Sequence, residues 1–162
     1  MSTKNVATHL SDHLAIHDLL NRYTNAINQR DWTAVEAAFA LDGVWDAGGP
    51  ELGENAYLFK TSQAIAKGIA DLVKPHELLV QSNHAPVIEV DGDSATATST
   101  INEYALAAGT PAMMVLWGTY YDDIVREADG EWRFRKRTFR YSWLENAAPR
   151  GHVMARFPRA RR

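Results

Sequence analysis

Two Asp-Gly pairs in the second half of the chain constrain its fold more than any other feature of the sequence. They are Asp91-Gly92 and Asp129-Gly130, and alternating runs such as Ala95-Thr96-Ala97-Thr98 flank them. An Asp-Gly pair in this setting is a strong hairpin signal, because glycine accepts the positive φ angle that a tight hairpin turn requires. The pattern therefore predicts a meander of four long strands, at about residues 78–90, 94–107, 113–127 and 131–143.

The first 75 residues are predicted to be mainly helical. A helix capped by Ser11 has apolar residues at the spacing of one buried stripe. This stripe consists of Ile16, Leu19, Leu20, Tyr23 and Ile27. Asp31 is expected to cap a second, short helix that runs through Phe39, and Thr61 or Ser62 is expected to cap a third, which Pro75 stops. Residues 47–60 have too little periodicity to be assigned.

A helical half followed by a meander is typical of the α+β class. We therefore expect a strongly curved antiparallel sheet packed against about three N-terminal helices. Pro86 lies inside the first predicted strand, and proline cannot donate to a strand ladder, so this strand should lie at an edge or contain a bulge. Residues 1–145 are expected to form a single domain, and residues 146–162 a basic C-terminal tail with Arg150, Arg156, Arg159, Arg161 and Arg162.

Composition narrows the classes of partner and chemistry. The 162 residues carry a net charge of −3, which gives no reason to expect nucleic acid or an anionic membrane as a partner. The chain has no cysteine, so disulfides and thiolate metal sites are excluded. No apolar run approaches the ~20 residues of a membrane span, and the first residues lack the apolar stretch of a secretion signal. A cytoplasmic protein without nucleic-acid or membrane partners is expected.

Residues that could bind a ligand or take part in catalysis lie on the predicted strands and helix ends. His9, His13 and His17 share helical spacing, but no further ligand accompanies them, so no metal site is predicted. Aromatic residues with polar tips suit the walls of a small-molecule pocket, and they equally suit a core whose polar tips reach water. The candidates for substrate binding are Trp45, Asn102, Tyr104, Trp117 and Tyr120.

Catalytic candidates follow from side chains that exchange protons. His84 is the best acid/base group by chemistry, because imidazole titrates near neutrality, although a lone histidine on a strand is more often structural. Strand alternation places Gln81 on the face opposite His84, unless a bulge near Pro86 changes the register. Tyr23 is a second candidate for proton transfer. Alternation places Arg137 on the solvent face, unless a twist or bulge follows Phe134.

Six segments of the chain together carry a resemblance to a known family. They are Ile16–Tyr23, Asp31-Trp32, Leu41–Trp45, Ile88–Ala95, Gly118–Asp123 and Asp129–Phe134. These segments resemble the SnoaL-like branch of the nuclear transport factor 2-like superfamily, and the resemblance covers roughly residues 10–144. It implies a cone of curved antiparallel sheet with a pocket at its open end, and a homodimer or homotrimer.

The resemblance also assigns residues. In the branch similar to scytalone dehydratase and the dehydrochlorinase, an Asp on the first helix orients a His that removes a proton from carbon. These two positions correspond to Asn28 and Gln81, neither of which is a base. A pocket arginine corresponds to Arg137 and a pocket tryptophan to Trp45.

The leading hypothesis is a lyase, isomerase or cyclase without metal or cofactor, which acts on a hydrophobic oxygenated small molecule by acid/base chemistry. The alternatives are a non-catalytic binding protein with the same pocket and a structural subunit like the β subunit of ring-hydroxylating dioxygenases. The proposed catalytic set is His84, Tyr23, Asn28, Gln81 and Arg137.

Overall fold

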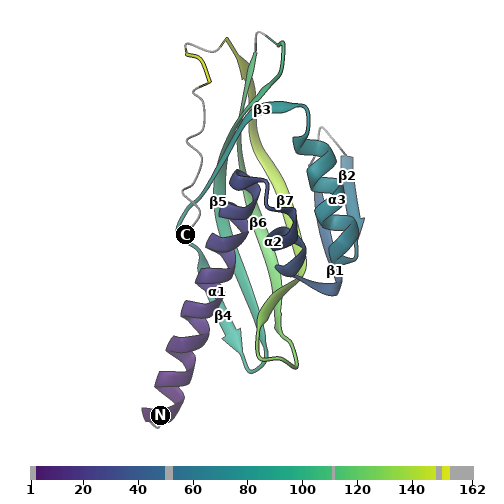
Figure 1. The fold of residues 1–162 in the computed structure, drawn as a ribbon. Helices are drawn as coiled ribbons and strands as arrows, with labels where there is room; N and C mark the ends of the chain where they lie inside the picture. Colours follow the sequence, from purple (N-terminus) through teal and green to yellow (C-terminus); the bar gives the residue numbers. More distant parts are fainter. Residues whose placement is uncertain (1–2, 50–52, 111, 149–150, 154–162) are drawn as a thin grey trace, which may run out of the picture.

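The computed structural model describes residues 3–49, 53–110, 112–148 and 151–153, which form three helices and one curved sheet (Figure 1). The helices are α1 (Thr3–Gln29), α2 (Trp32–Ala37) and α3 (Ser62–Val73). The strands are β1 (Phe39–Gly49), β2 (Gly53–Lys60), β3 (His76–Asn83), β4 (Val87–Asp91), β5 (Ser94–Ala107), β6 (Met113–Arg126) and β7 (Trp132–Ala147). Their order in the sheet is β2-β1-β7-β6-β5-β3, and β4 also pairs with β5.

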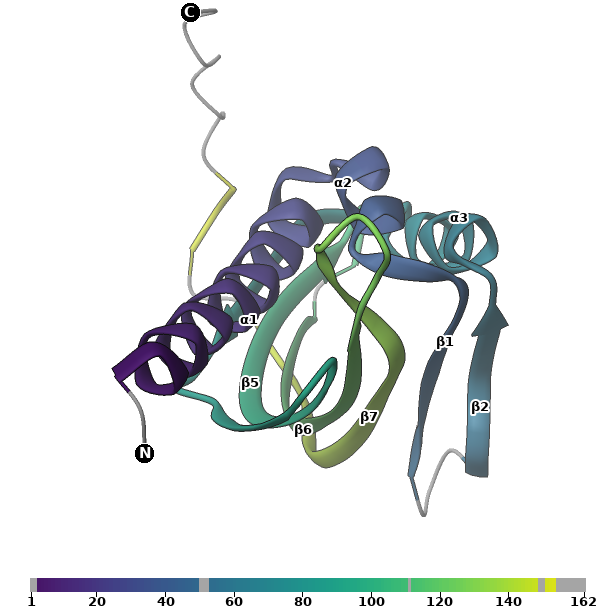
Figure 2. The same cartoon turned by 90° about the horizontal axis from the view of Figure 1, so that it is seen from below.

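The expected α+β architecture is confirmed. Strands β5, β6 and β7 pair antiparallel along most of their length, and Gly92 and Gly130 adopt φ angles of 59° and 86° in the two predicted turns. Strand β1 instead runs parallel to β7, so the sheet is mixed. Figure 2 shows the helices gathered on one side of the curled strands, where they cover the inner face of the sheet.

Helix α1 is longer than the sequence pattern predicts. It begins at Thr3, and Ser11 is an exposed residue within it rather than its cap. No glycine or proline interrupts residues 3–10, so nothing ends the helix on the N-terminal side of Ser11. The predicted stripe is correct, because Ile16, Leu20 and Tyr23 are all buried against the sheet.

The other two helices begin where their caps are predicted. The Asp31 carboxylate accepts a hydrogen bond from Ala34 N–H at 3.0 Å, and the Thr61 hydroxyl oxygen accepts one from Ala64 N–H at 3.3 Å. The extension of the second helix through Phe39 is wrong. Phe39 begins β1, because Phe134 N–H donates to the Ala38 carbonyl at 2.9 Å and draws the chain into the sheet.

Two further boundaries differ from expectation. The sequence leaves residues 47–60 unassigned; in the structure residues 47–49 complete β1 and residues 53–60 form β2, and these two strands pair antiparallel. The single strand predicted at 78–90 is two strands, β3 and β4, separated by residues 84–86. Both pair with β5 at one side of the sheet, as the edge position expected for Pro86 requires.

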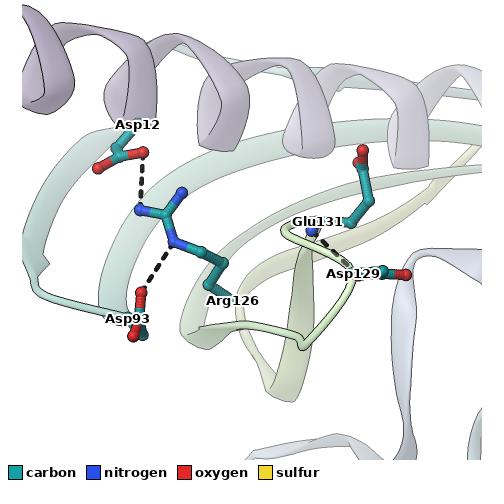
Figure 3. A network of polar contacts seen from close by, with 5 residues as sticks. All are labelled: Asp12, Asp93, Arg126, Asp129 and Glu131. Atoms are coloured by element: carbon teal, nitrogen blue, oxygen red, sulfur yellow. Dashed lines mark hydrogen bonds and ion pairs between the residues drawn. The ribbon is translucent and has the colours of Figure 1, made fainter.

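One arginine ties α1 to the sheet at the end where the hairpin turns lie. Arg126 makes ion pairs with Asp12 of α1 at 2.8 Å and with Asp93 at 2.9 Å (Figure 3). Its guanidinium also stacks on the Trp132 ring, 4.4 Å from the centroid. In the neighbouring turn the Asp129 carboxylate accepts a hydrogen bond from the N–H of Glu131. The ion pairs of Arg126 fix how α1 crosses the strands.

Two of the expectations concern the basic tail and membrane spans. The arginines expected in the basic tail lie outside the described residues, as does Pro111 in the turn between β5 and β6. Within the described ranges, no helix is both long and apolar enough to cross a membrane.

A buried glycine provides a test of the packing between β6 and β7. A Cβ atom at Gly118 would press into the Phe139 ring and lie 2.7 Å from the Arg140 carbonyl oxygen. Because backbone cannot move aside cheaply, we expect Gly118→Ala to lower the free energy of unfolding by about 1–3 kcal/mol in urea denaturation. Gly151→Ala is the control, since nothing lies within 4 Å of a Cβ there. Equal stability of the two variants would contradict this packing.

Candidate functional site

A cavity of about 200 Å³ lies between the helices and the inner face of the sheet. Aromatic and aliphatic side chains from α1, α3 and six strands form most of its walls, and a few polar side chains interrupt them. The lining residues are Tyr23, Ile27, Trp45, Tyr57, Ile69, Leu72, Val73, His76, Leu79, Gln81, Ile101, Glu103, Met114, Leu116, Tyr120, Phe139 and Tyr141. Apolar walls with few polar groups are typical of small-molecule sites.

Glu103 contributes the carboxyl group of this lining. It lies on β5 directly opposite Gln81 of β3, and the Gln81 side-chain amide donates a hydrogen bond to Glu103 Oε2 at 3.1 Å. The pKa of Glu103 is raised to about 6, because the effect of burial exceeds the opposite effect of the hydrogen bond from Gln81. A carboxyl group with this pKa is a base of useful strength near neutral pH.

Asn28 holds the strand segment that carries Gln81. Its side-chain amide donates to the Gln81 carbonyl at 2.8 Å, and its Oδ1 accepts from the Gln81 N–H at 2.7 Å. The pair of bonds joins the end of α1 to the exposed edge of β3, where the backbone has no further strand partner. The Asn28 amide is thus occupied by backbone, and it is absent from the cavity lining among the described residues.

A buried cation lies behind one wall of the cavity. Arg137 is fully buried, and its guanidinium lies 4.3 Å from the Tyr23 ring centroid, 3.8 Å from that of Tyr120 and 4.3 Å from that of Phe134. Its charged partner is Asp122, with Nε 3.6 Å from Oδ1. Burial raises the pKa of Asp122 to about 7, although the Arg137 charge acts in the opposite direction.

A bulge turns Arg137 inward. Lys136 pairs with Asp123 and Phe134 with Ile124, so Arg135 is an extra residue on β7. One extra residue reverses the alternation, and the inward set changes from even to odd positions. The simple alternation that placed Arg137 in solvent is therefore wrong, whereas the bulge considered as the exception is present.

The two phenols beside Arg137 are linked to each other. Burial raises the pKa of both Tyr23 and Tyr120, and a hydrogen bond between their hydroxyl groups raises that of Tyr23 further while it lowers that of Tyr120. The Arg137 charge lowers both pKa values. Tyr120 and Tyr23 are 3% and 1% exposed, and both line the cavity.

The structure brings only some of the predicted residues together. Tyr23, Trp45, Gln81 and Tyr120 line the cavity, and Asn28 and Arg137 support it from behind. The remaining four lie elsewhere. His84, Asn102, Tyr104 and Trp117 are on the outer face of the sheet, outside the lining.

The register slip near Pro86 that would have brought His84 into the cavity is not found, so His84 does not belong to the candidate catalytic set inside it. Its ring nitrogen Nε2 lies 3.0 Å from Asn102 Oδ1, and its ring stacks on Trp117 with centroids 5.5 Å apart. The His84 N–H still donates to the Thr100 carbonyl at 2.9 Å, so β3 keeps its register up to the break at Pro86. Without a slip in register, parity holds His84, Asn102 and Trp117 on the face opposite Gln81.

Two polar residues of the lining, Glu103 and His76, were not predicted from the sequence. Glu103 shares its strand face with Ile101 and Ala105, so the alternation of small and apolar residues on β5 was a signal that it points inward. His76 begins β3, two residues before the strand was predicted to start. The described residues contain no cluster of three or more histidine or carboxylate groups able to hold a metal.

The comparisons with known proteins agree with this geometry. The model of the SnoaL-like domain matches residues 8–138, and the chain therefore belongs to the SnoaL-like family. No protein of curated function matches it in sequence.

Solved structures share the fold at low sequence identity. A scytalone dehydratase-like protein from Novosphingobium aromaticivorans is 20% identical with a TM-score of 0.77, covering 96% of this chain and 98% of its own. A hexachlorocyclohexane dehydrochlorinase, LinA type 2, is 16% identical with a TM-score of 0.78, covering 90% and 95%. A protein assigned as an aromatic ring hydroxylase from Novosphingobium aromaticivorans is 20% identical, covers 85% and 94%, and has a TM-score of 0.74. These similarities establish the fold, and the reaction must be argued from the cavity.

The two hydrogen bonds between the Asn28 side chain and the Gln81 backbone, which we call the Asn28 clasp, should contribute to stability. Asn28→Ala removes both bonds to Gln81 and leaves a half-buried edge unpaired, so we expect the free energy of unfolding to fall by about 1–3 kcal/mol. Asn21→Ala on the same helix is the matched control, because the Asn21 side chain is exposed and hydrogen-bonds to His17 in its own helix. Urea denaturation of both variants checks the difference, and an equal loss in the two would contradict the clasp.

Proposed function

We propose that this protein is an enzyme that transfers a proton on a hydrophobic, oxygen-bearing small molecule, as lyases, isomerases and cyclases do, with Glu103 as the base. The single observation that carries the proposal is a carboxyl group of raised pKa in a cavity whose other walls are mostly apolar. Apolar surroundings exclude competing water and leave the carboxylate poorly solvated, which strengthens it as a base.

The reaction begins at a carbon next to a carbonyl group. The Glu103 carboxylate removes a proton from that carbon, and the electron pair of the C–H bond moves to form an enolate. The phenols of Tyr120 and Tyr141 line the same cavity and can donate hydrogen bonds to the enolate oxygen. The charge of Glu103 contributes to the raised pKa of both phenols, which supports their proximity to the carboxylate.

The enolate can then follow one of three routes. Return of the proton to another carbon gives an isomerase, loss of a leaving group from the neighbouring carbon gives a lyase, and attack on a second carbonyl gives a cyclase. His76 also lines the cavity and is a further group able to deliver a proton in the second step.

The other predicted residues take supporting roles in this proposal. Gln81 holds Glu103, and Asn28 holds Gln81. Tyr23 contacts Tyr120, whose ring Arg137 stacks against. A base on β5 supplies the group that neither Asn28 nor Gln81 can supply, and for this reason an enzyme is favoured over a binding protein with the same cavity.

Glu103→Gln tests the base. The amide cannot accept the proton, so we expect hydrogen–deuterium exchange next to the carbonyl of a ring ketone such as 2-tetralone, followed by NMR in D₂O, to slow by about 10²–10⁴-fold. Glu77→Gln is the matched control, because Glu77 is an exposed carboxylate on the adjacent strand. Retained exchange in Glu103→Gln would remove this mechanism, and the absence of exchange in the wild type with every ring ketone tried would favour a binding protein.

The pH dependence of the exchange provides a second test. Only ionised Glu103 accepts a proton, so the rate should fall as the pH falls through about 6. Because the hydrogen bond from Gln81 lowers the pKa of Glu103, Gln81→Leu should move this midpoint to higher pH. A midpoint that stays in place in Gln81→Leu would show that Gln81 does not position the base.

A further inference from the structure

The charge of the cavity lining is one-sided. Among the described residues, the lining contains one carboxylate, Glu103, and no lysine or arginine. His76 is the one histidine of the lining among the described residues. An ionised Glu103 therefore faces the cavity with a single side-chain amide, that of Gln81, as its recorded hydrogen-bond partner.

Three arginines that contact the lining residues or the strands around the cavity have partners outside it. Arg137 lies behind the rings of Tyr23 and Tyr120, and Asp122 at 3.6 Å offsets its charge. Arg30 donates a hydrogen bond to the His76 carbonyl, and Arg140 pairs with Asp46 at 3.0 Å. None of these guanidinium groups is among the lining residues, so none is placed to receive an anionic group in the cavity.

The phenols of the cavity respond to this negative charge. Tyr120 and Tyr141 have raised pKa values first because of burial, and the charge of Glu103 contributes to the rise in both. A charge that disfavours a phenolate at these positions disfavours a ligand carboxylate or phosphate there in the same way.

The walls suit uncharged and cationic rings. Trp45, Tyr57, Tyr120, Phe139 and Tyr141 present aromatic surface to the same space. Aromatic faces attract organic cations, and a carboxylate beside them adds to that attraction. The volume of about 200 Å³ is below the range of drug-sized pockets, so a ligand of one or two rings fits.

We propose that this cavity excludes anions and takes an uncharged or cationic molecule of one or two rings, with Glu103 as the group that makes the selection. The proposal deepens the proposed function, because it concerns the same site and restricts its substrate to one without a carboxylate or phosphate. It concerns binding alone and does not require turnover.

Three ligands of matched shape test the selection. Acetophenone is uncharged, benzylammonium is a cation and benzoate is an anion, and their dissociation constants can be measured by isothermal titration calorimetry at about pH 8, where Glu103 is ionised. We expect benzoate to bind at least about tenfold more weakly than acetophenone, because two like charges a few ångströms apart repel strongly away from water. Benzylammonium should bind at least as tightly as acetophenone.

Variants identify the responsible group. Glu103→Gln should bring the affinity for benzoate to within about threefold of that for acetophenone and should weaken the binding of benzylammonium, because the repelling charge is gone. Glu77→Gln removes an exposed carboxylate from the adjacent strand and should leave all three affinities unchanged. Acetophenone serves as the internal control for folding, since its affinity should change little in either variant.

Three outcomes would overturn the proposal. They are benzoate binding as tightly as acetophenone in the wild type, an unchanged ratio of the two affinities in Glu103→Gln, and no measurable binding of any of the three ligands. Selection against benzoate in a protein that catalyses no exchange would sustain this proposal while contradicting the proposed reaction, so the two fail separately.

Discussion

The packing of Tyr23 against the inner face of the sheet is the contact on which the rest of the structure depends. Its ring meets Phe39, Phe134 and Tyr120 edge-on, with centroids 5.6 to 6.2 Å apart. Through this one residue α1 is held to strands β1, β6 and β7. The helices lie over the concave face of this curved sheet (Figure 2), and the cavity is lined by side chains from both.

Two carboxyl groups of the interior, the buried Asp122 and the half-buried Glu103, have different partners. Asp122 and Glu103 both have raised pKa values because burial disfavours their charged forms. Asp122 faces a guanidinium that is stacked among three rings, and an arginine so placed resists both movement and solvation. Burying such a pair is seldom stabilising by itself, because the loss of hydration opposes the attraction. Glu103 has the Gln81 amide as a hydrogen-bond partner in place of a cation, and it lines the cavity.

Local signals in the sequence were enough to predict two of the hairpin turns, the starts of α2 and α3 and the approximate extent of β5, β6 and β7, whereas the site depends on distant pairings. The two Asp-Gly turns and the caps at Asp31 and Thr61 each depend on the chemistry of a few adjacent residues, and all of them are found. The membership of β1 in the sheet was harder to predict, because its partner β7 is about ninety residues away in the chain.

The residues on the inner face of the sheet show the same difference between what local signals predict and what depends on distant pairings. Alternation correctly separated Gln81 from His84, and the same rule applied to β5 would have identified Glu103 beside Ile101 and Ala105. On β7 the rule failed at Arg135, since a bulge depends on the register of the neighbouring strand and leaves no composition signature of its own.

That bulge has a consequence for how this interior can change over evolutionary time. If β7 ran past Arg135 without a bulge, the two faces of the rest of the strand would be exchanged, and Phe139 and Tyr141 would turn out to water while their polar neighbours turned in. Deletion of Arg135 itself would leave Phe134 opposite Ile124 and Lys136 opposite Asp123, so it would remove the bulge and keep both faces. An insertion or deletion beyond the bulge would instead exchange the faces of the residues that follow it, whereas point substitutions can reshape the walls gradually. The bulge is therefore a place in β7 where a residue can be lost without turning the cavity wall outward.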